Sequence, residues 1–101
     1  LPAWADVPAV DRDHHLRAQR FARVRVAEMR LYKSALVLEG RRTSALYALL
    51  REDIGQARTE FSEQFLGACG SMTDYLHAEL VRTLANDDAR LLGDDYPGPL
   101  T

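Results

Sequence analysis

The four prolines of this chain lie near its two ends, and their placement constrains the fold more than any other feature. Two belong to the first ten residues and two to the last five. Because proline lacks a backbone N–H and its ring clashes with the preceding turn, it is excluded from helix interiors. We therefore expect residues 1–10 and 94–101 to be extended arms. The proline-free residues between them, 11–93, are expected to form one helical domain.

Apolar residues recur every three or four positions through this stretch, which is the period of an amphipathic helix. No segment alternates apolar and polar residues as a half-buried strand does. Gly40 is expected to end the first helix, and Ser71 to cap the third with Asp74 as its capping-box partner. We expect an all-α, three-helix domain with a long first helix, an antiparallel helical hairpin and a third helix. These helices are expected over residues 11–39, 43–65 and 71–85, followed by a short turn over 89–92.

The apolar stripe of the first helix contains one carboxylate, Glu28, between Val24 and Leu31. A buried carboxylate needs an ion-pair partner, because an unpaired buried charge is costly. Two roles are open: a structural pair with Arg58 or Arg82, or an ion pair that sets the register across an oligomer interface. The residues expected to pack in the core or at an interface are Phe21, Val24, Glu28, Leu31, Leu38, Ile54, Phe61 and Phe65.

Charge is distributed unevenly along the chain, although the formal net charge is only −2. Residues 11–33 contain seven basic and three acidic side chains, whereas residues 58–95 contain three basic and eight acidic ones. The first helix is therefore expected to pack beside the acidic third helix, with modest surface pairing. The alternative is a face that binds nucleic acid or another anionic surface. Its expected contacts are Arg17, Arg20, Arg23 and Arg30.

Few residues of the chain are suited to catalysis or to metal binding. One cysteine and three histidines are present, without a nucleophile-elbow sequence or a glycine-rich phosphate loop. Asp74 and His77 have the spacing at which a carboxylate and an imidazole can share a metal ion, as Glu and His do in ferritin-like bundles. The same spacing is typical of a helix cap followed by a surface histidine. We expect no catalysis and no cofactor, and a metal-binding bundle is the third alternative.

Residues 20–32 (RFARVRVAEMRLY) resemble the RFARLLVSEIKLYN-type run of an uncharacterised helical segment at the C-termini of bacterial proteins. Residues 46–54, 79–86 and 96–100 resemble later parts of that segment, so the resemblance spans about residues 14–100. The chain departs from it at Val24 and Arg25, where the family has two apolar residues. The resemblance implies a C-terminal accessory module and no active site.

The first helix is expected to be longer than its neighbours, which leaves apolar surface for a further helix to cover. We therefore expect an interaction or oligomerisation module, acting as a homo-oligomer or as a subunit of a larger bacterial assembly. No apolar run reaches the roughly 18–20 residues that span a bilayer. The single thiol fits a reducing compartment, so a cytoplasmic protein is expected.

Overall fold

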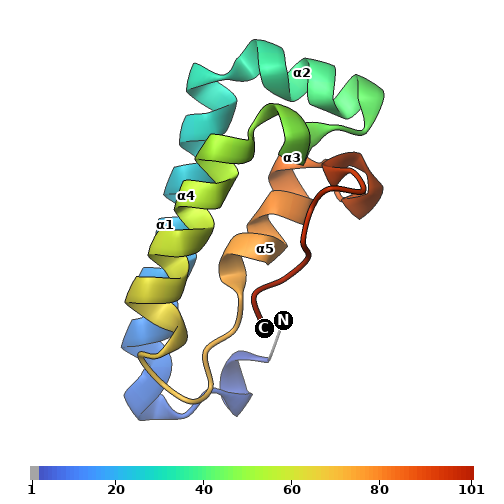
Figure 1. The fold of residues 1–101 in the computed structure, drawn as a ribbon. Coiled ribbons are helices and arrows are strands. Elements are labelled where there is room, and N and C mark those ends of the chain that lie inside the picture. The colour runs from blue at the N-terminus through green and yellow to red at the C-terminus, as the bar shows by residue number, and fades with distance from the viewer. Residues whose placement is uncertain (1–2) are drawn as a thin grey trace.

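The computed structural model describes residues 3–101, and every regular element in that range is helical (Figure 1). No strand occurs among these residues, which confirms the all-α class. Residues 1 and 2 of the expected N-terminal arm lie outside the described part. The α-helices are α1 (Arg12–Tyr32), α2 (Ser34–Thr43), α3 (Leu46–Leu49), α4 (Arg51–Phe61) and α5 (Tyr75–Glu79).

Short turns of other helical types lie between and beyond these helices. The expected N-terminal arm contains two 3-10 turns, Trp4–Asp6 and Ala9–Asp11, and is therefore not fully extended. Residues 94–101 carry no helix, as expected. The remaining turns are the π-helical segments Ser62–Leu66 after α4 and Leu80–Leu84 after α5, and the 3-10 turn Ala89–Leu92.

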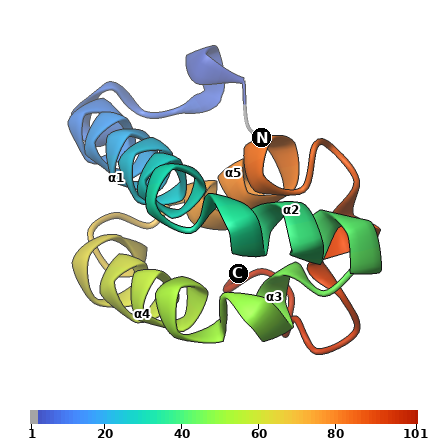
Figure 2. The same ribbon diagram turned by 90° about the horizontal axis from the view of Figure 1, so that it is seen from above.

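Three helices lie side by side along the length of the molecule, which measures 41 × 21 × 21 Å. α1 and α5 run in one direction and α4 runs antiparallel to them (Figures 1 and 2). α1 contacts both α4 and α5, so the basic helix does pack beside the predicted third helix. α2 and α3 lie at one end of this arrangement and pack against each other.

The long first helix expected over residues 11–39 is interrupted at Lys33. Its backbone angles, φ −123° and ψ 32°, lie outside the helical region, and they separate α1 from α2. Since residue 33 is neither proline nor glycine, no local signal marks the bend. α2 turns across the end of the molecule, where the side chain of its residue Val37 is buried.

Gly40 does not end a helix but lies inside α2, buried against Leu46. The residue that ends α2 is Ser44, whose φ of 54° is in the left-handed region. The prediction for Gly40 is wrong because the glycine permits a close approach of helices rather than a turn.

The core-facing side of α1 is displaced around the helix from the stripe that contains Val24, Glu28 and Leu31. Its buried apolar residues are Ala18, Ala22, Val26 and Met29. Small alanines on this side allow α4 and α5 to approach closely. The other core residues agree better with expectation: Ile54 and Phe61 are fully buried, and Phe21 and Phe65 pack against the core.

The predicted third helix begins at Tyr75 rather than at Ser71. Asp74 is the true cap, because its Oδ1 accepts a hydrogen bond from the backbone N–H of His77 at 2.9 Å. Ser71 instead donates to Asp11 Oδ2 at 2.8 Å and lies 2.9 Å from His15 Nε2. This serine therefore ties the loop before α5 to the start of α1.

Within the part of the chain that the structure describes, no helix combines the length and the apolar character that crossing a bilayer requires.

Candidate interaction surface

The solvent-facing side of α1 carries a row of exposed residues with a four-residue spacing, which is inclined by about 26° to the helix axis. Three members are large and apolar: Leu16, Val24 and Tyr32, whose exposed fractions are 53%, 49% and 73%. Arg20 and Glu28 fill the positions between them and are also exposed. Residues four apart are neighbours on a helix surface, so the five side chains follow one inclined ridge, with Leu16 and Tyr32 turned to opposite sides of Val24. We call Leu16, Arg20, Val24, Glu28 and Tyr32 the outer row.

The position of α1 explains why the outer row is free. Figure 2 shows α1 at the edge of the molecule, with α4 and α5 on its inner side. The inner side of α1 already supplies four buried apolar residues to the core. Val24 and Leu31, which were expected in the stripe around Glu28, therefore face solvent, Leu31 with an exposed fraction of 69%.

Arg20 and Glu28 are among the charged residues of α1 that have no ion-pair partner within residues 3–101, as are Arg12, Arg23 and Arg30. By contrast, Arg17 pairs with Asp13 at 2.5 Å, and Arg25 pairs with Glu60 of α4. The rise of about 1.5 Å per residue places Arg20 and Glu28 about 12 Å apart along α1, too far for a direct pair.

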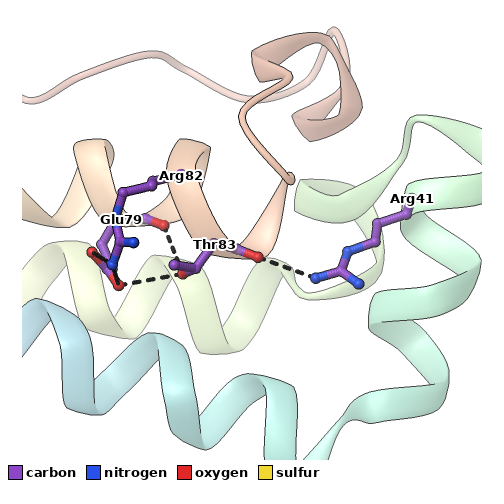
Figure 3. Close-up of polar contacts among 4 residues, drawn as sticks. All are labelled: Arg41, Glu79, Arg82 and Thr83. Atoms are coloured by element: carbon purple, nitrogen blue, oxygen red, sulfur yellow. Dashed lines mark hydrogen bonds and ion pairs between the residues drawn. The ribbon is translucent and has the colours of Figure 1, made fainter.

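The intramolecular partners expected for Glu28 are both engaged elsewhere, so that prediction is wrong. Arg58 donates to the carbonyl of Gly98 at 2.6 Å. Arg82 forms an ion pair with Glu79 at 2.8 Å (Figure 3). Glu28 is exposed and needs no buried partner.

The charge complementarity between the two halves of the chain is satisfied mainly through α4. Arg25 of α1 pairs with Glu60, and Lys33 lies 4.0 Å from Asp53. Among the described residues, α1 forms no ion pair with α5. The packing of the first helix beside the third therefore rests on apolar contacts rather than on charge.

A shallow groove of about 390 Å³ lies where α1 and α2 meet, and we call it the elbow groove. Leu31 and Leu38 line it, and Leu38 has an exposed fraction of 65%. Arg41 lies on the α2 side, where it donates hydrogen bonds to the carbonyl of Leu84 at 2.9 Å and to the carbonyl of Thr83 at 3.1 Å, the second of which is drawn in Figure 3. The groove extends the apolar surface beside the outer row.

A second groove, of about 560 Å³, lies between α1 and α5. Its lining includes four charged side chains, Arg23, Arg82, Glu79 and Asp87. Two positive and two negative side chains cancel, so this groove has no marked preference for an anion.

The four arginines of the predicted anion-binding face are all exposed on α1, but they adjoin different features of its surface. Arg17 is paired with Asp13, and Arg20 belongs to the outer row. Arg23 lines the groove toward α5, whereas Arg30 lines the elbow groove. At about 100° per residue the four spread over about 140° of the α1 surface, and the anion-binding face that they would form stays a prediction.

Asp74 and His77 do lie together, but as part of the contacts that hold the C-terminal segment. Asp74 is buried, and its Oδ2 accepts from the backbone N–H of Leu100 at 2.6 Å. The His77 ring stacks on Tyr96, and its Nδ1 lies 2.7 Å from the tyrosine hydroxyl. Over residues 3–101 no three His, Cys, Asp or Glu residues are grouped to hold a metal ion.

Tyr96 should make the free energy of unfolding fall at alkaline pH. Burial raises the pKa of its hydroxyl to about 12, above the value of about 10 for an unfolded chain. The unfolded state then releases its proton first, so the stabilisation is complete below pH 10 and is lost between pH 10 and 12. Urea unfolding at pH 9 and pH 11 should show a smaller loss of stability for Tyr96→Phe than for the wild type. Equal losses in both proteins would contradict the assignment.

His15 was not among the predicted functional residues, yet it has the most buried polar side chain of the described chain. Its Nδ1 lies 2.5 Å from the Tyr75 hydroxyl. Because Ser71 uses its proton on Asp11, His15 Nε2 must donate to Ser71, and Nδ1 is free to accept from Tyr75. The network is fully satisfied, which indicates a role in holding the loop before α5. The sequence offers no signal for it beyond the histidine itself.

Searches against protein-family models, curated proteins and solved structures found no match to this chain.

Proposed function

We propose that this chain is a non-catalytic oligomerisation module that associates with a second copy through the outer side of α1. The observation that carries the proposal is the set of large apolar side chains on the outer row. Leu16, Val24 and Tyr32 are exposed on a helix whose opposite side already supplies the core. Folding of the monomer gains little from them, whereas a partner helix would bury them.

The elbow groove supports the same proposal. Leu31 and Leu38 are among the most exposed large apolar residues of the described chain, and both lie next to the outer row or at its end. The resemblance to a bacterial C-terminal segment also favours an accessory module that assembles a larger protein. One pair of helices buries less than the roughly 1,200 Å² of a standard interface, so we expect a weak dimer that forms at high protein concentration.

Val24→Glu should abolish self-association without unfolding the protein. The substitution places a carboxylate at the centre of the outer row, where half of the native side chain is already exposed. In a symmetric dimer the two new carboxylates would also repel each other. Light scattering on a concentration series should show the wild-type mass rising from 11.4 kDa towards twice that value, and the variant staying at 11.4 kDa.

Val10→Glu is the matched control, because it makes the same chemical change at a valine with an exposed fraction of 84% outside α1. It should leave self-association unchanged, and circular dichroism should show native helicity for both variants. A wild-type protein that stays monomeric at millimolar concentration would overturn the proposal, as would equal weakening by both substitutions.

A further inference from the structure

The order of charged and apolar residues along the outer row makes it complementary to a second copy that runs in the opposite direction. From Leu16 to Tyr32 it is apolar, positive, apolar, negative, apolar, with Val24 at the centre. In a reversed second copy, the positive position meets the negative one on both sides of the centre. We propose that two α1 helices pair antiparallel with Val24 on the two-fold axis, so that Arg20 contacts Glu28 of the partner subunit. This inference rests on the proposed function and specifies its geometry.

The packing of helix ridges makes this arrangement attainable. Rows of residues four apart run parallel across the interface when two helices cross at about −50°, the commonest class of helix pair. A two-fold axis through Val24 places position 20 of one helix beside position 28 of the other, because both lie four residues from the centre. Both ion pairs form at the same time, since a two-fold interface repeats each contact.

The parallel in-register alignment and the antiparallel alignments centred on a charged residue bring like charges together. A parallel pair places Arg20 beside the same arginine of the partner, and Glu28 beside the same glutamate. An antiparallel pair centred on either charged residue places that residue against its own copy. Among the antiparallel arrangements centred on one of these three residues, only the one at Val24 joins opposite charges.

A second copy also fits the outer row better than an acidic helix does. An acidic helix would pair with Arg20 but would repel Glu28, which has no partner of its own among the described residues. Val24 meets its own copy at the centre of such a pair, with one opposite-charge pair on either side of it. The centre of the row is therefore complementary to itself in both charge and apolar character.

Charge reversal tests the predicted pairs. Arg20→Glu and Glu28→Arg should each weaken self-association by about tenfold at about 50 mM salt, because each replaces two attractive contacts with repulsive ones. The double variant should return to the wild-type dissociation constant, measured by sedimentation equilibrium. An equimolar mixture of the two single variants should also associate like the wild type, because the mixed dimer restores both opposite-charge pairs.

Disulfide trapping tests the position of the axis without relying on charge. With the single native Cys69 changed to Ser, Val24→Cys should give a covalent dimer under mild oxidation. Glu28→Cys is the matched control, because the two copies of position 28 lie about 12 Å apart along the helices. Cα atoms more than about 7 Å apart cannot be bridged, so this control should stay monomeric.

The results separate this inference from the proposed function on which it rests. If Val24→Glu abolishes association while the charge variants all bind like the wild type, the surface is right and the antiparallel register is wrong. Efficient trapping through position 28 but not position 24 would overturn the register as well. A wild-type protein that never associates would overturn both.

Discussion

Phe61→Ala is expected to lower the free energy of unfolding by about 3–5 kcal/mol, the usual range for deleting a buried aromatic ring. Phe61 is completely buried, and its ring lies 6.1 Å from Phe21 and 5.3 Å from Phe65, measured between centroids. Truncation leaves a cavity between α4 and the start of α1. Since a domain of this size is stable by only about 5–15 kcal/mol, a large part of its stability would be lost.

Urea unfolding followed by circular dichroism measures this loss, with Tyr32→Ala as the control. Tyr32 is also a large aromatic residue of a helix, but it has an exposed fraction of 73%. At concentrations where the protein is monomeric, its truncation should change stability by less than about 0.5 kcal/mol. Equal effects of the two substitutions would contradict the assignment of the core.

The sequence was sufficient to predict the helical class and the packing side of α4. Terminal prolines and three-to-four spacing indicate helices, and Ile54 and Phe61 are buried as their spacing predicts. α4 was predictable because its apolar residues lie on one side only and its charged residues largely on the other. In such a helix the periodicity has a single interpretation.

α1 could not be predicted in the same way because its apolar residues cover a wide arc of the helix. The side with larger residues, Val24 and Leu31, was the obvious choice for the core, yet it faces solvent. The core instead uses Ala18 and Ala22, which permit close packing but contribute little to a hydrophobicity pattern. Periodicity finds the sides of a helix, but the neighbouring helices decide which side is buried.

The bend at Lys33 and the start of α5 depend on contacts between distant residues. Nothing near residue 33 breaks a helix, and α2 turns because Val37 and Gly40 are buried against the rest of the fold. Serine is a residue type that often caps helices, but the hydroxyl of Ser71 donates its hydrogen bond to Asp11, sixty residues away in the sequence. Local propensity cannot foresee such a partner.

The candidate surface was only partly visible in the sequence. Glu28 was singled out by its position in an apolar stripe, and an ion pair across an interface was one of its two expected roles. Arg20 was assigned to an anion-binding face. A pair between Arg20 and Glu28 of two copies can be considered only because the structure shows that both side chains are exposed. The structure removes the intramolecular alternatives for Glu28 by giving Arg58 and Arg82 other partners.

Two glycine-to-alanine substitutions should change stability in opposite directions. At Gly40, an added Cβ would lie 2.7 Å from Leu46 Cδ2 and 2.9 Å from Leu46 Cα. The second of these atoms is backbone, so α2 and α3 would have to move apart. We expect Gly40→Ala to cost about 1–3 kcal/mol, as overpacking of a core usually does.

Gly55→Ala is the matched case, because Gly55 also lies inside a helix but no atom lies within 4 Å of an added Cβ. There the substitution should stabilise the protein by about 0.5–1 kcal/mol, since alanine favours the helix over glycine. Urea midpoints of the two variants and the wild type test both signs in one experiment. If both variants gained stability, α2 and α3 would not approach as closely as the structure shows. The contact between Gly40 and Leu46 would then not explain why α2 turns across the end of the molecule.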